Sequence, residues 1–302
     1  MLYSFNAEKS GIRIDFYIAS RIEGLSRTFL NNIIKEGRAK CNGKPCKPSY
    51  KTNFGDKIDI DIPEPESTGM QAQNIPLDIL YEDEWLTVIN KPRGLVVHPA
   101  PGHKDGTLVN ALLYHYRDDL SDINGRLRPG IVHRIDKDTS GLLLVVRRNE
   151  VHIKMAEAIA RHEVLRTYKA LCCGIINENQ GTIDLPIGRD PVNRLRNAVV
   201  REGRKAITHF VVLERFLNHT YTQLTLETGR THQIRVHMSH IGHPILGDTL
   251  YGGYRKDIPV KGQLLHASRL EFIHPVSNRD IIIEAPVPEE FNRMLKLLGD
   301  NR

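Results

Sequence analysis

The chain has 302 residues, of which 40% are hydrophobic and 26% are charged, and its formal net charge at pH 7 is +6. These fractions are typical of a globular protein, and the length predicts about two domains of roughly 150 residues each. No apolar run approaches the ~20 residues that span a bilayer, and the N-terminus lacks the pattern of a signal peptide. Four cysteines are too few for a disulfide framework, so the sequence excludes disulfide-rich and membrane-spanning classes and predicts a cytoplasmic protein.

The first elements predicted along the chain are two helices and a small sheet. Apolar residues at helical spacing predict the two helices: Ile14, Ile18 and Ile22 in the first, and Leu30, Ile33 and Ile34 in the second. Ser26 is the predicted N-cap of the second helix. Asn42-Gly43 predicts a tight turn, and residues 54–62 alternate between apolar and polar as a half-buried strand does.

The sequence predicts a boundary between domains after this unit. Residues 63–76 are rich in Pro, Glu, Gln and Ser and contain almost nothing apolar to bury. We therefore expect an N-terminal domain at 12–62, a linker at 63–76 and a second domain at 77–302.

The second domain combines strand-like and helix-like segments. The strands are expected at residues 85–90, 142–147, 166–173, 206–216, 221–227, 264–272 and 280–284, and the helices at 107–116, 151–162, 231–241 and 289–298. Consecutive strands joined by turns dominate, and strict alternation of strand and helix is absent. The sequence predicts an α+β fold with a mostly antiparallel sheet and flanking helices, not a doubly wound sheet.

Positive charge is concentrated in the N-terminal unit. Residues 13–51 contain nine Lys or Arg and three acidic residues, a local charge of +6 that equals the charge of the whole chain. A basic face of this kind suits phosphate contacts without sequence reading, and a solvated surface is the alternative. An ordered set of short segments in this unit resembles the RNA-binding domain named for ribosomal protein S-four. These segments are Arg13-Ile-Asp15, Ser26-Arg27, residues 32–37, Asn42-Gly43, Lys47 and Gly55-Asp56. That resemblance implies RNA contacts from Arg27, Lys35, Lys44 and Lys47.

The segment His133-Arg-Ile-Asp-Lys-Asp-Thr-Ser-Gly141 carries the strongest chemical signal. An isolated Arg-x-Asp is more often a structural ion pair than a catalytic site. Here, however, charges, hydroxyls and a glycine directly precede the apolar strand predicted at 142–146, and functional groups are common in polar loops at the ends of rigid strands.

This segment closely resembles the signature of the RluA-type pseudouridine synthases. Further segments typical of that family follow in the expected order, at residues 90–99, 166–171, 227–237, 265–267 and 274–275. The resemblance implies an enzyme that isomerises uridine in structured RNA to pseudouridine, with large-subunit ribosomal RNA as its partner. It also implies that no cofactor or metal is needed, because no group is gained or lost.

The resemblance assigns roles to individual residues. Asp136, not Asp138, is the implied nucleophile, attacking either the ribose or the uracil ring. Arg235 is its implied basic partner, which favours the ionised carboxylate. Tyr168 is expected to stack on the target base and to accept the C5 proton, for which its pKa must fall, and the charge of Arg235 was the expected cause. A uracil within a stem must be extruded to react. Arg134 is expected to occupy the vacated space or to contact the flipped nucleotide, with His133 and Thr139 as further substrate-binding residues.

Two alternatives of other classes are open on the sequence alone. One is an RNA-binding or ribosome-assembly protein that keeps the domain only as a scaffold. The other is a base-excising glycosidase, which normally uses paired carboxylates; Asp136 and Asp138 are too close in sequence for that pairing. The fourteen histidines do not form a zinc-hydrolase spacing, so we expect no metal site, and we expect the chain to act as a monomer.

Overall fold

The computed structural model describes residues 1–22, 27–62, 70–99, 103, 105–117, 119–123, 128–256, 258 and 260–300. The N-cap predicted at Ser26 and residues 63–69 of the predicted linker lie outside this part of the chain.

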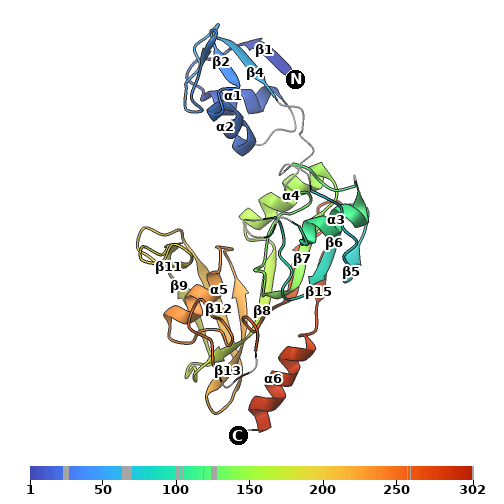
Figure 1. Cartoon of the computed structure of the whole chain (residues 1–302), viewed down its shortest axis with the longest axis vertical. Helices are drawn as coiled ribbons and strands as arrows, with labels where there is room; N and C mark the ends of the chain where they lie inside the picture. Colours follow the sequence, from blue (N-terminus) through green and yellow to red (C-terminus); the bar gives the residue numbers. More distant parts are fainter. Residues whose placement is uncertain are drawn as a thin grey trace.

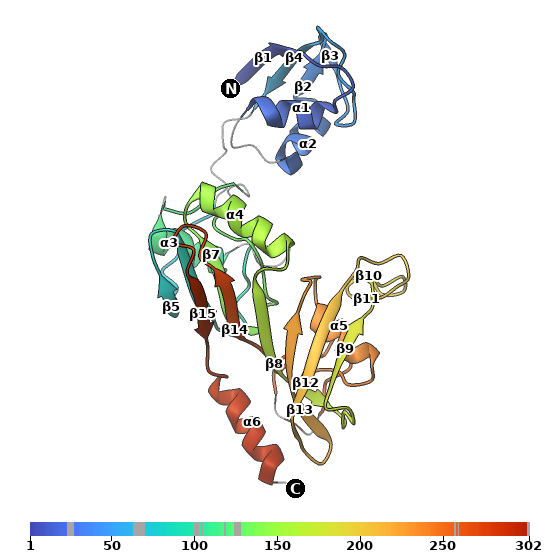
Figure 2. The same ribbon diagram turned by 180° about the vertical axis from the view of Figure 1, so that it is seen from behind.

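The N-terminal unit is a four-stranded sheet with two helices. In chain order its elements are β1 (Leu2–Asn6), α1 (Ile14–Arg21), α2 (Arg27–Lys35), β2 (Ala39–Cys41), β3 (Lys44–Pro45) and β4 (Lys57–Asp61). The strands are antiparallel in the order β1-β4-β2-β3. Figures 1 and 2 show both helices on one side of this sheet.

Both predicted helices are present, and their apolar residues form the core of this unit. Ile14, Ile18, Leu30, Ile33 and Ile34 are buried there together with residues of β2 and β4. The turn predicted at Asn42-Gly43 joins β2 to β3, and both of its residues have positive φ, which an Asn-Gly pair tolerates. Strand β4 begins only at Lys57, because Asn53 and Asp56 form a turn in which the Asp56 carboxylate accepts the Asn53 N–H.

The rest of the chain is built on one large sheet. Its strands are β5 (Ile79–Glu82), β6 (Leu86–Lys91), β7 (Ser140–Val146), β8 (Leu165–Cys173), β9 (Gln180–Asp184), β12 (Ile207–Arg215), β13 (His219–Leu226), β14 (Leu265–Ile273) and β15 (Asp280–Glu284). Their order is β5-β6-β7-β14-β8-β13-β12-β9, with β15 also paired to β14, and the pair β7–β14 is parallel while the other pairs are antiparallel. The α+β fold with a mostly antiparallel sheet is therefore confirmed.

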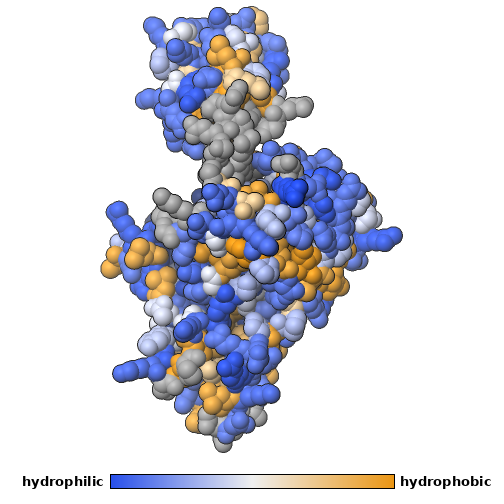
Figure 3. Space-filling view, turned by 45° about the vertical axis from the view of Figure 1, so that its right-hand side comes forward, coloured by the Kyte–Doolittle hydropathy of each residue, from blue (hydrophilic) through white to orange (hydrophobic). Residues whose placement is uncertain are grey.

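In the described part of the chain, four helices and a small hairpin accompany this sheet. They are α3 (Leu108–Tyr116), α4 (Asn149–Ala160), α5 (Gln233–His240) and α6 (Glu289–Asp300), with β10 (Ile187–Arg189) and β11 (Asn197–Val199) as the hairpin. Figures 1 and 2 show α3 and α4 beside the half that contains β6 and β7, and α5 beside the half that contains β12 and β13. Hydrophilic residues cover much of the face in Figure 3, and hydrophobic ones gather in patches near its middle.

Strand β7 is the centre of the core, since all seven of its residues are buried. Gly141 is required there, because a Cβ on it would lie 2.2 Å from the carbonyl oxygen of Ala267 in β14, and its φ is +107°. Gly141 thus permits the close contact between β7 and β14 where these two strands pair in parallel.

Residues 70–76, in the segment expected to be a linker, pack against α3. The side chain of Asn110 donates to the carbonyl oxygen of Gln71, and the N–H of Gln73 donates to that of Asn110. Met70 packs against the large core. Within the described residues, no helix is long and apolar enough to cross a membrane.

Candidate active site

A cavity of about 460 Å³ opens where the loop before β7 faces β8 and α5. This volume is within the range of small-ligand sites. Six residues expected from the sequence to act on the substrate line it together: His133, Arg134, Asp136, Thr139, Tyr168 and Arg235. The fold therefore brings into one place side chains that lie up to 102 positions apart in the chain.

Asp136 lies in a tight turn that is held on both sides. The N–H of Thr139 donates to the carbonyl oxygen of Asp136 at 3.1 Å, which closes the turn immediately before β7. The carbonyl oxygen of Lys137 accepts from the backbone N–H of Gly94 and from the ammonium group of Lys91. The Thr139 hydroxyl accepts from the Gln263 side chain at 3.1 Å. These contacts orient the Asp136 carboxylate toward the cavity.

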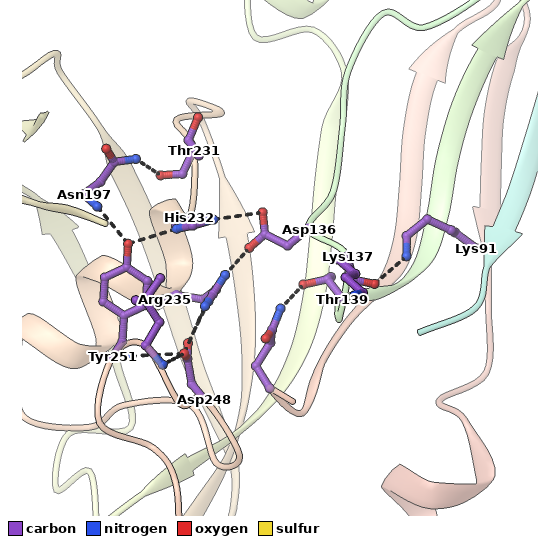
Figure 4. Close-up of polar contacts among 12 residues, drawn as sticks. Lys91, Asp136, Lys137, Thr139, Asn197, Thr231, His232, Arg235, Asp248 and Tyr251 are labelled. Atoms are coloured by element: carbon purple, nitrogen blue, oxygen red, sulfur yellow. Dashed lines mark hydrogen bonds and ion pairs between the residues drawn. The ribbon is translucent and has the colours of Figure 1, made fainter. Parts of the chain in front are cut away.

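The carboxylate of Asp136 is paired with Arg235 of α5. Nη1 of Arg235 donates to Oδ2 of Asp136 at 2.8 Å, and Nε and Nη2 donate to the two carboxylate oxygens of Asp248 at 2.7 and 3.0 Å. Figure 4 shows the guanidinium between the two carboxylates. Burial alone would lower the pKa of Arg235, but the hydrogen bonds and charges of Asp248 and Asp136 outweigh it and raise that pKa. Arg235 is thus a fixed cation beside Asp136.

His232 and Tyr251 surround this ion pair. Nε2 of His232 lies 3.7 Å from Oδ1 of Asp136, and its Nδ1 is 3.0 Å from the hydroxyl of Tyr251. The guanidinium of Arg235 stacks over the Tyr251 ring at 5.0 Å. Burial lowers the pKa of His232, so its ring is neutral at pH 7. His232 adopts a left-handed backbone conformation, so α5 begins at Gln233, two residues after the predicted start.

Tyr168 is buried in β8 and faces the same cavity. Burial raises the pKa of Tyr168; the charge of Arg166 opposes this shift and the charge of Asp136 adds to it. The expectation that Arg235 lowers this pKa is therefore wrong, because the cation that acts on the phenol is Arg166, and Arg235 is engaged by two carboxylates.

Lys91 is a buried lysine on the opposite side of the turn. It is fully buried, and its ammonium group donates to the carbonyl oxygens of Pro92, Leu95 and Lys137 at 2.8, 2.8 and 3.0 Å. Burial lowers its pKa to about 7, although the charges of Asp138 and Asp136 oppose the shift. Its position in Figure 4 shows that it supports the backbone of the turn and does not contact the carboxylate of Asp136.

The two remaining residues of the predicted set have different environments. Arg134 is exposed, and its Nη1 lies 3.3 Å from Nε2 of His98. His133 is anchored to the fold, because its Nε2 accepts the backbone N–H of Leu144 in β7 at 2.9 Å. Burial, helped by the charge of Arg166, lowers the pKa of His133 to about 3.

The structure separates the two aspartates of the motif. Asp136 lines the cavity. Asp138 instead packs against Gly262, so closely that a Cβ added to Gly262 would lie 2.8 Å from the Cβ of Asp138. Among the residues predicted to bind RNA from the N-terminal unit, Lys35, Lys44 and Lys47 are exposed. The side chain of Arg27 lies outside the described part of the chain.

Sequence reasoning missed several residues of the site. Arg166 stands two positions before Tyr168 and therefore on the same face of β8, which was a usable signal. Lys91 lies in the family segment at 90–99, but its role follows only from its burial. Asp248 and Tyr251 left no such signal, because only their burial and their long-range contacts mark them. Within the described residues, no group of three or more His, Cys, Asp or Glu is placed to hold a metal ion.

Comparisons with known proteins identify the family of this chain. Residues 86–240 match the family model described as RNA pseudouridylate synthase. The chain is 48% identical to "Uncharacterized RNA pseudouridine synthase YlyB" of Bacillus subtilis, covering 97% of this chain and 96% of the relative. It is 45% identical to "Ribosomal large subunit pseudouridine synthase D" of Pseudomonas aeruginosa, covering 98% and 94%.

A solved structure shares the fold as well. The chain resembles human "RNA Pseudouridylate Synthase Domain Containing 1" with a TM-score of 0.57 and 25% identity, covering 78% of this chain and 97% of that one. The cavity, the motif that supplies Asp136 and the relatives converge, and the chain belongs to the RNA pseudouridylate synthase family, as an enzyme of the RluA type that acts on RNA.

Proposed function

We propose that this enzyme isomerises a specific uridine of large-subunit ribosomal RNA, with Asp136 as the nucleophile. The observation that carries the assignment is the 2.8 Å pair between Asp136 and Arg235 at a cavity lined by Tyr168. The relatives named as large-subunit enzymes support the choice of RNA.

In the proposed reaction, the Asp136 carboxylate attacks the ribose or the uracil ring of the target nucleotide. The carboxylate forms a bond to the ribose or to the ring, the N1–C1′ bond breaks, the base turns and C5 bonds to C1′. The bond to the carboxylate breaks in the same or the following step and frees Asp136, and C5 loses its proton while N1 gains one. The paired Arg235 keeps the carboxylate oriented and favours its charged form. Tyr168 stacks on the base, and burial raises the pKa of its phenol, which keeps it protonated at neutral pH.

We further propose that the target uridine leaves its stem to enter the cavity. The stacked base cannot be reached by a carboxylate that is 17% exposed at the base of a cavity. Arg134 is the exposed cation at this site, and it contacts the nucleotide or fills the space that the base vacates.

We propose that residues 12–62, together with β1, which pairs with β4 and extends this unit to Leu2, form an RNA-binding domain. Residues 63–76 join it to the catalytic domain at 77–302. Lys44 and Lys47 are exposed on or next to the β2–β3 hairpin of the N-terminal unit and are suited to phosphate contacts. Replacing both by Gln is expected to raise KM and leave kcat unchanged. We expect the chain to work in the cytoplasm as a monomer.

Tritium release tests the nucleophile. Ribosomal RNA labelled with tritium at uridine C5 is incubated with wild type, Asp136→Asn and the matched control Asp138→Asn. We expect release from wild type and from the control, and none from Asp136→Asn, because an amide is not a nucleophile of this kind. Release that survives in Asp136→Asn refutes the assignment, and release from small-subunit RNA alone refutes the choice of substrate.

A further inference from the structure

Arg166 is a buried arginine without a partner in the described structure. Its side chain comes from the middle of the sheet, where β8 pairs with β13 at Leu226 and with β14 at Leu270. Only 7% of the residue is exposed, and it lines the same cavity as Asp136. Its Nε is buried without a hydrogen-bond partner, and no hydrogen bond or ion pair joins its guanidinium to any residue that the structure describes.

Arg235 gives an internal comparison for this arrangement. It is also 7% exposed, but it forms ion pairs with two carboxylates. Buried arginines normally need such partners, because an unpaired charge is costly to remove from water. A guanidinium that lacks them beside an open cavity is arranged for an anion that arrives with the substrate.

The cavity itself provides no anion for Arg166. Its lining contains four arginines and a single carboxylate, and that carboxylate, Asp136, is already bonded to Arg235. Each nucleotide of an RNA substrate brings one phosphate, and the planar guanidinium fits phosphate oxygens with paired N–H donors.

A second donor without an acceptor lies in the same cavity. Nε2 of His133 accepts the Leu144 N–H, so the proton of the neutral ring is on Nδ1. This Nδ1 is buried and has no partner in the described structure. The two groups are close enough for the charge of Arg166 to contribute to the lowered pKa of His133. An anion with several acceptor oxygens would satisfy both.

Gly229 leaves the space that the guanidinium occupies. A Cβ at this position would lie 2.7 Å from Nη1 of Arg166, closer than a real contact allows. A side chain there would push the guanidinium away from its place at the cavity wall.

We propose that Arg166, together with the Nδ1–H of His133, binds a phosphate of the target nucleotide and so positions the extruded uridine against Asp136. This inference rests on the proposed function, because it takes the target nucleotide as the occupant of the cavity. Arg166 is a substrate-binding residue in this proposal, and the reaction itself needs no proton or electron from it.

The test compares Arg166→Met and Arg166→Lys with wild type, and uses exposed Arg293→Gln on α6 as the matched control. Tritium release gives kcat/KM, filter binding of ribosomal RNA gives Kd, and both are measured over a range of KCl concentrations. Removing one phosphate contact is expected to make the slope of log affinity against log salt shallower by about 0.7–0.9. We expect kcat/KM of Arg166→Met to fall about 10- to 100-fold, because this is the effect of losing one hydrogen bond to a charged group.

Arg166→Lys is expected to keep the wild-type salt slope and part of the activity, and Arg293→Gln to match wild type. The melting temperature decides between a binding and a structural role. We expect Arg166→Met to melt no lower than wild type, because it removes a buried charge that lacks a partner. Gly229→Ala keeps the charge but displaces it, so kcat/KM should fall while the melting temperature stays within a few degrees of wild type.

Three results would overturn the proposal. A large loss of melting temperature or of folding in Arg166→Met assigns Arg166 to structure. An unchanged salt slope with lower activity in Arg166→Met would mean that Arg166 contacts a neutral group of the base or ribose and not a phosphate. Unchanged activity would mean that Arg166 does not bind the substrate. If wild type releases no tritium, the proposed function fails, while the salt slope of RNA binding still tests the phosphate site separately.

Discussion

Replacing Asp248 by Asn tests how much the site depends on a carboxylate that does not line the cavity. The side chain of Asp248 is fully buried, and it accepts two hydrogen bonds from Arg235 at 2.7 and 3.0 Å. An amide of the same shape keeps one acceptor and turns an NH₂ group toward the guanidinium. Arg235 then stays buried with Asp136 as its one remaining carboxylate.

Removing one partner of a buried ion pair costs about 3–5 kcal/mol, and the matched shape of Asn favours the lower end. For a domain of this size, each kcal/mol lowers the melting temperature by about 2–4 °C. We therefore expect Asp248→Asn to melt about 6–12 °C below wild type. We also expect kcat to fall about 100-fold, because a released guanidinium misplaces the Asp136 carboxylate by an ångström or so.

Differential scanning calorimetry and single-turnover tritium release measure the two effects. Asp136→Asn is the contrasting variant: its side chain is 17% exposed and accepts one hydrogen bond from Arg235. We expect no activity but a loss of only about 1.5 kcal/mol, the lower end for a hydrogen bond to a charged group. Wild-type kcat in Asp248→Asn, measured at a temperature where the variant is folded, would refute the reasoning that Asp248 holds Arg235 for catalysis.

Three further predictions concern the motif and its neighbours. Gly141→Ala places a Cβ 2.2 Å from the backbone oxygen of Ala267, so we expect a loss of at least about 3 kcal/mol in chemical denaturation; a stable variant contradicts the packing argument. The pKa of His133 falls from 6.5 to about 3 on folding, so its stabilising contribution is present above pH 6.5 and is lost as the pH falls toward 3. Between pH 7.5 and 5 this amounts to about 2 kcal/mol, and the pH dependence of unfolding should be shallower in His133→Gln; equal slopes exclude His133 as the cause. Burial raises the pKa of Tyr168, so kcat should show no ionisation of this phenol below pH 10, and whatever activity Tyr168→Phe retains should keep the shape of the wild-type pH profile.

The regular elements with strong patterns were predictable, and the short ones were not. The apolar run after Gly141 became the buried strand β7, and the helical repeats of Ile14 and Ile18 became α1. The strands β5, β9, β10 and β11 were missed because they are three to five residues long and mostly half-exposed, so they carry too little periodicity. Helix α5 starts two residues after the predicted start because His232 has a left-handed backbone conformation, which no pattern in the sequence predicts.

The sequence by itself determined the family and the nucleophile candidate, because the motif around Asp136 is a continuous stretch whose turn, glycine and buried strand are local properties. It also placed Tyr168 and Arg235 in other family segments. Only the tertiary structure decided which charges compensate one another, because Asp136 and Arg235 lie 99 positions apart and the second carboxylate of the pair is the unpredicted Asp248. Charge compensation depends on distance and burial in three dimensions. For the same reason, only the fold could show that Arg166, and not Arg235, is the cation that acts on Tyr168 and is left without an anion of its own.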